Sequence, residues 1–280
     1  MTGMPDRLAR AIAVVEEAAI LAKRFFHARD TIETRTKKAQ DFVSEADTTV
    51  ETLIRERLAK AFPGEEVVGE EMGGDAGDAY WIIDPIDGTS NFLRGSPLWG
   101  ISLGFVRNGR PDLGVVALPA LGDILAAADG TGLFLNRQPC PRDVPFAEVR
   151  LMSLGDSLSD DIEVIAALHS GLRRSGWIVE GFHATSIGLA FTARGILDGH
   201  LQKTTTMWDI AGGAVLVREA GLEVRIGHDP VSDAYWIAAG TEALLEATER
   251  LWPATSRKIQ EQGCKAPDAF LSKQREWRGV

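Results

Sequence analysis

The chain has 280 residues, of which 45% are hydrophobic and 25% charged, so it can bury either one large core or two halves that share an interface. The formal net charge of −10, which no basic block offsets, argues against nucleic acid as the main ligand. No apolar run approaches the roughly 18 residues that a membrane span needs. The two cysteines lie far apart in the chain, which favours a cytoplasmic protein with free thiols.

The N-terminal part of the chain is predicted to combine helices with a meander of strands. Apolar residues at helical spacing indicate an amphipathic helix over 1–26 and a second helix over 44–61. Short strands are expected at 67–68 and, buried, at 80–83. Between 100 and about 135, apolar runs are separated by turn signals that contain Gly, Asn and Pro, which predicts an antiparallel meander.

Beyond about residue 150, predicted strands and helices alternate along the chain. This pattern is typical of an α/β half in which helices cover a sheet. We therefore expect an α/β layered sandwich with an N-terminal half (1–145), a C-terminal half (146–262) and a tail (263–280) for which the sequence suggests no role. No linker separates the halves, so they should pack as one unit.

The segment WIIDPIDGTSNF (81–92) places two carboxylates, Asp84 and Asp87, where a strand is expected to end. Pro85 restricts one backbone dihedral, so the turn is stiff and can direct both carboxylates and the Ile86 carbonyl to one point. Two anions this close repel each other unless a cation lies between them, and Mg²⁺ prefers oxygen ligands. The alternative is an aspartate that caps a helix, with the second aspartate in solvent.

The small residues after this motif, Gly88, Thr89 and Ser90, are expected to open a helix. The first N–H groups and the dipole of a helix favour a phosphate oxygen. The spacing does not fit a Ca²⁺-binding EF-hand loop, because Ile86 stands where an oxygen ligand is required. It also differs from the spacing of enzymes that form an aspartyl phosphate, so a covalent intermediate is disfavoured.

Four further acidic residues are weak signals when each is taken alone. Glu70 and Glu71 follow a predicted strand, where paired glutamates are usually solvated. Asp47 and Asp209 precede helical patterns, so each is equally compatible with a purely structural role at a helix N-terminus.

In this order and at these spacings, the segments GEE (69–71), WIIDPIDGTSNF (81–92) and WDIAGG (208–213) resemble the inositol monophosphatase family. That family belongs to a lithium-sensitive sugar-phosphatase superfamily that includes fructose bisphosphatase. The resemblance covers residues 5–245 and implies the αβαβα sandwich of these enzymes. It also implies a phosphomonoesterase with two or three Mg²⁺ ions, inhibition by Li⁺ and a homodimer.

The resemblance assigns roles to individual residues. It makes Asp47 and Thr89 the pair that orients and deprotonates the attacking water, with Glu70 as a further catalytic group. Gly88, Thr89 and Ser90 would hold the phosphate. The metal ligands that it implies are Glu70, Asp84, the carbonyl of Ile86, Asp87 and Asp209.

The segments expected to face the substrate fit the family less well. Where the family carries an acidic residue before the Trp-Asp motif, this chain has Gln202, with Lys203 beside it. The turn expected at 185–190 lacks a hydroxyl that the family pattern contains. We assign substrate binding to Gln202, Lys203 and Asp209, and we expect only modest selectivity among small phosphomonoesters.

Inositol monophosphate is thus the predicted substrate, hydrolysed to inositol and phosphate by a metal-activated water. Histidinol phosphate and 3′-phosphoadenylyl nucleotides are alternative substrates. A regulatory protein that keeps the fold and binds a partner is a third possibility, although clustered carboxylates would not benefit a pure scaffold. His183 and His200 could border the cleft but are interpreted as structural or surface residues.

Overall fold

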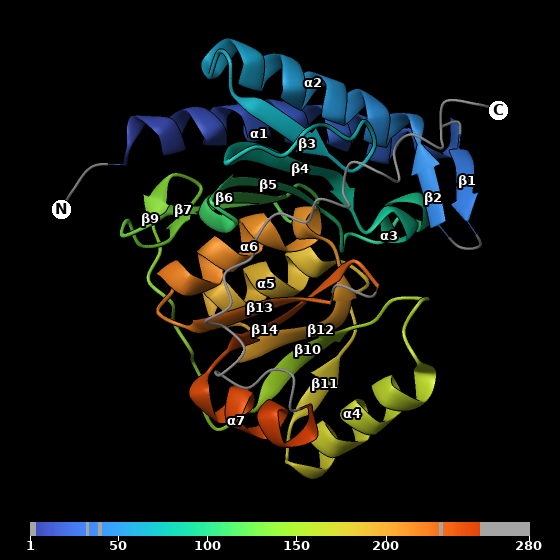
Figure 1. The fold of residues 1–280 in the computed structure, drawn as a ribbon, viewed down its shortest axis with the longest axis vertical. Helices are drawn as coiled ribbons and strands as arrows, with labels where there is room; N and C mark the ends of the chain where they lie inside the picture. The colour runs from blue at the N-terminus through green and yellow to red at the C-terminus, as the bar shows by residue number, and fades with distance from the viewer. Residues whose placement is uncertain (1–3, 32–33, 39–40, 230–231, 253–280) are drawn as a thin grey trace.

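A computed structural model describes residues 4–31, 34–38, 41–229 and 232–252. The elements form five layers in the order helices, sheet, helices, sheet, helices, which confirms the predicted αβαβα sandwich (Figure 1). The three helical layers are α1 (Asp6–His27) with α2 (Glu45–Ala61), then α5 (Thr185–Arg194) with α6 (Met207–Glu219), and finally α4 (Ile162–Arg174) with α7 (Glu242–Leu251).

The larger sheet has seven strands in chain order, and all neighbouring pairs except β3 and β4 are antiparallel. The meander predicted between 100 and 135 is therefore confirmed. The strands are β3 (Glu66–Gly69), β4 (Ala79–Asp87), β5 (Gly100–Arg107), β6 (Arg110–Leu118), β7 (Asp123–Ala128), β8 (Phe134–Leu135) and β9 (Gln138–Pro139).

The stiff turn predicted after Ile83 is wrong, because β4 continues to Asp87. Asp84 pairs with Ser102 and Asp87 with Gly100. Two residues of β4 therefore lie between these pairs, opposite one residue of β5. One extra residue on a strand is a β-bulge, which redirects the side chains at that point. Proline has no N–H to donate and is tolerated at such an irregularity, so the motif bends inside a strand rather than after one.

Helices cover both faces of this sheet. Helix α1 buries Leu8, Ile12 and Val15 against β6 and β7, and α2 buries Val50 and Ile54 against β4 and α1. Both helices are predicted elements and are confirmed. On the opposite face α6 contacts β5 and β6 at short range, since a side chain on Gly114 would overlap with the α6 backbone. This close packing brings the first turn of α6 to the end of β4.

The smaller sheet has the strand order β11-β10-β12-β14-β13. Strand β10 is parallel to both of its neighbours, whereas the pairs β12–β14 and β13–β14 are antiparallel. The alternating elements predicted up to α6 are confirmed, but the sequence prediction did not include β13, β14 or α7. The strands are β10 (Leu151–Gly155), β11 (Ile178–Glu180), β12 (Gly199–Thr205), β13 (Glu223–Asp229) and β14 (Ala234–Gly240).

Three small elements and the chain ends complete the description. The hairpin of β1 (Thr34–Lys38) and β2 (Asp41–Ser44) precedes α2, and a short helix, α3 (Thr89–Arg94), follows β4. The chain passes from the larger to the smaller sheet between β9 and β10, around the proposed division at residue 145. The predicted tail, 263–280, lies outside the described residues. None of the helices in the described part of the chain is long and apolar enough to cross a membrane.

Candidate active site

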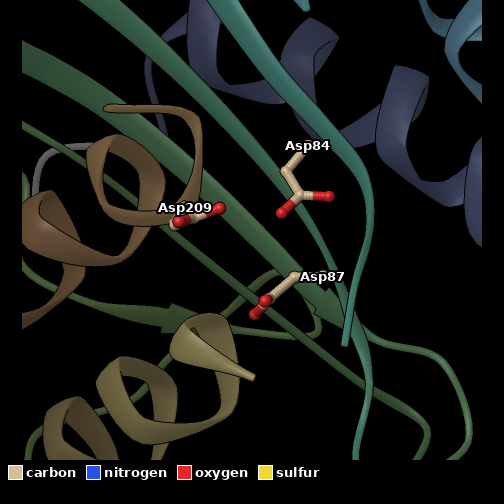
Figure 2. Close-up of side chains that lie close together, drawn as sticks. All are labelled: Asp84, Asp87 and Asp209. Carbon is tan, nitrogen blue, oxygen red and sulfur yellow. The ribbon is translucent and has the colours of Figure 1, made fainter. Parts of the chain in front are cut away.

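Three aspartate side chains converge where β4 ends and α6 begins (Figure 2). Asp84 and Asp87 lie in the bulged part of β4, and Asp209 lies in the first turn of α6. One carboxylate oxygen of each residue lies within 4.8 Å of the others. Asp84 and Asp87 are buried and Asp209 is partly exposed. Three carboxylates at this separation match the hard oxygen ligands that Mg²⁺ prefers, so the residues fit a divalent cation.

The electrostatics of this acidic group also favour a cation. Burial, followed by the charges of Glu70 and Asp87, holds the pKa of Asp84 well above its usual 3.8. Burial and then the charge of Asp209 raise the pKa of Asp87 to about 7, although the backbone N–H of Ser186 donates to this carboxylate and opposes the rise. Burial likewise raises the pKa of Asp209. A bound cation would offset the repulsion that the ionised carboxylates exert on one another.

Asp47 and Asp209 occupy the same position in their helices, three residues after the N-cap. The backbone N–H and the hydroxyl of Ser44 donate to Oδ2 of Asp47 over 2.9 and 2.5 Å. In α6 the Thr205 hydroxyl and the Thr206 N–H donate to Oδ2 of Asp209 over 2.8 and 3.1 Å. Helix capping therefore orients both carboxylates. A structural role at a helix N-terminus is thus compatible with a role in the site.

Thr89 is the first residue of α3 and lies beside Asp47. Its hydroxyl donates to Oδ1 of Asp47 over 3.3 Å and lies 3.1 Å from the carbonyl oxygen of Ile86. Gly88 precedes it with φ +85°, a conformation that favours glycine, and Ser90 is exposed on the same helical turn. The structure thus brings together the two residues that were predicted to orient the attacking water.

Glu70 lies in the turn that follows β3. Its backbone N–H donates to the carbonyl of Ile83 over 3.1 Å, which holds the residue beside β4. Its carboxylate is close enough to raise the pKa of Asp84, but it is not among the three residues whose oxygens lie within 4.8 Å of one another. Its role as a metal ligand therefore stays a prediction.

A cavity of about 170 Å³ opens beside the acidic group. Its lining includes Asp87, Asp209 and Gln202, so the acidic group and a residue predicted to bind substrate face one space. Lys203 is not among the residues that line this cavity, and its Nζ lies 4.0 Å from a carboxylate oxygen of Asp160. The predicted contact between Lys203 and substrate thus has no support in this geometry.

Gln202 is held in the cavity wall by a chain of buried polar groups. Its Oε1 accepts from the Thr185 hydroxyl over 2.7 Å and lies 3.3 Å from Nε2 of His200, whose Nδ1 is 2.8 Å from the Ser153 hydroxyl. Its Nε2 donates over 3.2 Å to the carbonyl of Thr204, which can only accept, so the orientation of the amide is determined. Burial lowers the pKa of His200 to about 4, which keeps the ring neutral at neutral pH. Gln202 therefore has an amide hydrogen, rather than its carbonyl oxygen, to offer to a ligand.

Comparison with known proteins agrees with this geometry. The sequence model of the inositol monophosphatase family matches residues 5–260, which is nearly the whole chain. This chain belongs to the inositol monophosphatase family. The match extends beyond residues 5–245, where the motifs resemble the family, and covers both sheets of the fold.

This chain is similar to family members that carry different names. The inositol-1-monophosphatase of Rhizobium meliloti is 34% identical over 84% of this chain and 91% of its own length. The histidinol-phosphatase of Mycobacterium tuberculosis is also 34% identical, over 77% of this chain and 85% of its own length. The crystal structure of the extragenic suppressor protein SuhB from Bartonella henselae matches with a TM-score of 0.80, 25% identity and coverage of 89% and 99%. The first two relatives are named as phosphatases of different substrates, and the name of the third gives no substrate.

Some residues of the site were not predicted from the sequence or were given another role. His183 and His200 were interpreted as structural or surface residues that could border the cleft, and both line the cavity, with His200 buried in its wall. Ser153, its neighbour on β10, was not predicted at all, and no motif surrounds it. The turn predicted at 185–190 is instead the first part of α5, which supplies Thr185 to the cavity.

Proposed function

We propose that this chain is a Mg²⁺-dependent phosphomonoesterase and that inositol monophosphate is its leading substrate. The main support is the convergence of Asp84, Asp87 and Asp209 close to the hydrogen-bonded pair of Asp47 and Thr89. Such a site offers ligands for cations, a base and a hydroxyl that can relay a proton, which metal-assisted hydrolysis requires. The inositol monophosphatase family is a phosphatase family, which supports the same class of reaction.

The proposed metal ligands are all hard oxygen donors, as Mg²⁺ requires. When bound, two or three Mg²⁺ ions would neutralise the charge of the phosphate and make a water molecule more acidic. Glu70 would also contribute to catalysis, because its charge acts on the acidic group. The residues that would hold the ions are Glu70, Asp84, the carbonyl oxygen of Ile86, Asp87 and Asp209.

The chain itself would handle the proton and orient the phosphate. Asp47 would accept the proton of the attacking water through the hydroxyl of Thr89. The backbone N–H groups of Gly88, Thr89 and Ser90 would orient the phosphate oxygens, since the first N–H groups of a helix lack acceptors within it. Asp209 lines the cavity and would also contact the substrate.

The experiment that tests this function is the release of phosphate from inositol 1-phosphate with Mg²⁺ and with EDTA. We expect hydrolysis that requires Mg²⁺ and that Li⁺ inhibits. Absence of hydrolysis for every phosphomonoester offered, with Mg²⁺ present, would favour the alternative of a regulatory binding protein without catalysis.

Histidinol phosphate is a second candidate substrate, supported by a specific feature of the cavity. Asp156 and His183 both line it, and Nδ1 of His183 lies 3.3 Å from Oδ1 of Asp156. A carboxylate at this position could bind the cationic part of such a substrate. The kcat/KM values of inositol 1-phosphate, histidinol phosphate, fructose 1,6-bisphosphate and 3′-phosphoadenosine 5′-phosphate, measured side by side, test the choice. A lead of about a hundredfold for any of the last three would exclude inositol monophosphate as the preferred substrate.

The family resemblance further supports a homodimer, which light scattering at micromolar concentration would detect and a monomeric mass would exclude. We keep the cytoplasm as the proposed location, to be tested by cell fractionation. Neither nucleic acid nor a membrane is a proposed partner.

A further inference from the structure

A buried carboxylate on α2 holds the turn that carries Glu70. Glu51 lies one helical turn beyond Asp47 on α2, and its side chain is fully buried. Its two oxygens accept the backbone N–H groups of Glu71 over 2.9 Å and of Met72 over 3.2 Å. The two residues that immediately follow Glu70 are therefore attached to the same helix that supplies Asp47.

Arg55, one further helical turn along α2, completes this attachment. Its Nε donates to Glu51 over 2.8 Å, and its two terminal nitrogens donate to the carbonyls of Val67 over 3.1 Å and of Gly73 over 2.5 Å. The carbonyl of Val67 lies within β3, two residues before the turn, and that of Gly73 lies at the end of the turn. The guanidinium group thus connects the strand before the turn and the last residue of the turn to the carboxylate of Glu51.

The turn itself is closed tightly around Glu51. Gly69 and Gly73 exchange two backbone hydrogen bonds of 3.0 Å, so the turn 69–73 is a small loop of fixed width. A side chain on Gly69 would overlap with the carboxylate oxygens of Glu51, so this residue has to be glycine for the carboxylate to enter. Each of these contacts restricts the backbone on either side of Glu70.

A buried ion pair is often only a structural feature, and its contribution to stability is small or even negative. This pair differs because Glu51 accepts from the backbone of Glu71 and Arg55 donates to the backbone of Gly73, both in the turn that carries Glu70. The charge of Glu70 in turn raises the pKa of Asp84. We propose that Glu51 and Arg55 are positioning residues that hold Glu70 where it can bind a metal ion. This inference rests on the proposed role of Glu70 as a metal ligand.

The test is a calorimetric titration of the full-length protein with Mg²⁺ in the absence of substrate. In the Glu51→Gln variant an NH₂ group replaces one of the two side-chain oxygens. One of the two backbone N–H groups therefore loses its acceptor and faces another donor. We expect the affinity for Mg²⁺ to fall about 10- to 100-fold, as is typical when a residue that orients a ligand is changed. The Mg²⁺ concentration that gives half-maximal phosphatase activity should rise by the same factor, with kcat largely recovered at saturating Mg²⁺.

The matched control is Glu249→Gln, which changes a glutamate bound over 2.5 Å to the buried side chain of Arg225, outside the proposed site. This variant should lower Tm without changing the affinity for Mg²⁺. The Arg55→Lys variant keeps the charge next to Glu51 but cannot reach both carbonyls, and it should weaken Mg²⁺ binding in the same direction. If Glu51→Gln does not fold, the Mg²⁺ affinity of Arg55→Lys still tests the positioning role.

The outcomes separate the two proposals. If the unchanged protein does not bind Mg²⁺, the proposed metal site is wrong. If the unchanged protein binds Mg²⁺ and both folded variants bind it equally well, the positioning role of Glu51 and Arg55 is wrong. Loss of the native fold in both variants would also overturn this role, because the pair would then be maintaining the fold rather than placing Glu70.

Discussion

The hydroxyl of Thr89 donates a hydrogen bond to Oδ1 of Asp47, while Ser44 at the start of α2 holds the other oxygen of the same carboxylate. The carboxylate is therefore fixed at one oxygen by a helix end and meets the hydroxyl with the other. A fixed carboxylate that meets a hydroxyl in this way is a suitable acceptor for a proton relayed from water.

This arrangement predicts that Thr89→Ala lowers kcat far more than it raises KM. The hydroxyl would act in the proton transfer, which occurs in the transition state, so its removal should cost about 10²- to 10⁴-fold in kcat. Thr89→Ser keeps the hydroxyl and should recover most of the activity. Steady-state kinetics of both variants measures the two parameters, and a change restricted to KM would instead make Thr89 a substrate-binding residue.

Asp87→Asn should separate catalysis from stability. The substitution removes one ligand charge, so we expect turnover to fall by roughly 10²- to 10³-fold or more. It also removes a buried negative charge that repels Asp209, so the metal-free variant should melt at a higher temperature than the metal-free parent at neutral pH and above. Asp161→Asn, the same change at the exposed N-cap of α4, is the control and should leave kcat unchanged, because asparagine also caps a helix. Near-normal turnover in Asp87→Asn would contradict the metal assignment.

The raised pKa values predict how pH affects the stabilisation by Mg²⁺. Asp87 has a pKa of about 7 in the folded, metal-free protein and 3.8 in the absence of perturbation, so between these values the folded state holds a proton that the unfolded state has lost. The metal-free protein should therefore lose stability as pH rises from about 4 to about 7. Mg²⁺ binds the ionised carboxylates, so the rise in Tm that it causes should be larger at about pH 8 than at about pH 5.5. Thermal melts with EDTA and with Mg²⁺ measure this difference, and a rise that is independent of pH would contradict the prediction.

The sequence predicts those parts of the fold that depend on local patterns. The helical spacing of Leu8, Ile12 and Val15 is sufficient to predict α1, and the turn signals between 100 and 135 are sufficient to predict the meander. The end of β4 depends on its pairing with β5, where the bulge between Asp84 and Asp87 forms, so a local pattern cannot reveal it. The pairing of β14 with both β12 and β13 is also a tertiary feature, and these last strands were not predicted.

The same distinction applies to the candidate site. Asp47 and Asp209 each satisfy a helix end, so the local sequence cannot distinguish a capping residue from one that also serves a site. Their assignment came from the resemblance to the inositol monophosphatase family. Ser153 and His200 are partners across the parallel pair of β10 and β12, so their proximity depends on a strand register that no motif encodes. For this reason the sequence did not reveal that Ser153 and His200 meet in the wall of the cavity, although Gln202 on the same wall was predicted.

The wall of the cavity leads to a final prediction, on selectivity. The carbonyl oxygen of Gln202 is already occupied by Thr185 and His200, so its amide can donate to an acceptor on the substrate, including an oxygen of a second phosphate. A carboxylate at this position would repel a second phosphate, whereas a sugar hydroxyl can rotate and donate to it. Gln202→Glu should therefore lower kcat/KM for fructose 1,6-bisphosphate by about 10- to 100-fold relative to inositol 1-phosphate. Gln138→Glu adds the same charge at an exposed position on β9 and should leave the ratio unchanged. Kinetics with both substrates decides the matter, and an equal loss for the two in Gln202→Glu would mean that this side chain does not face the part of the substrate that distinguishes them.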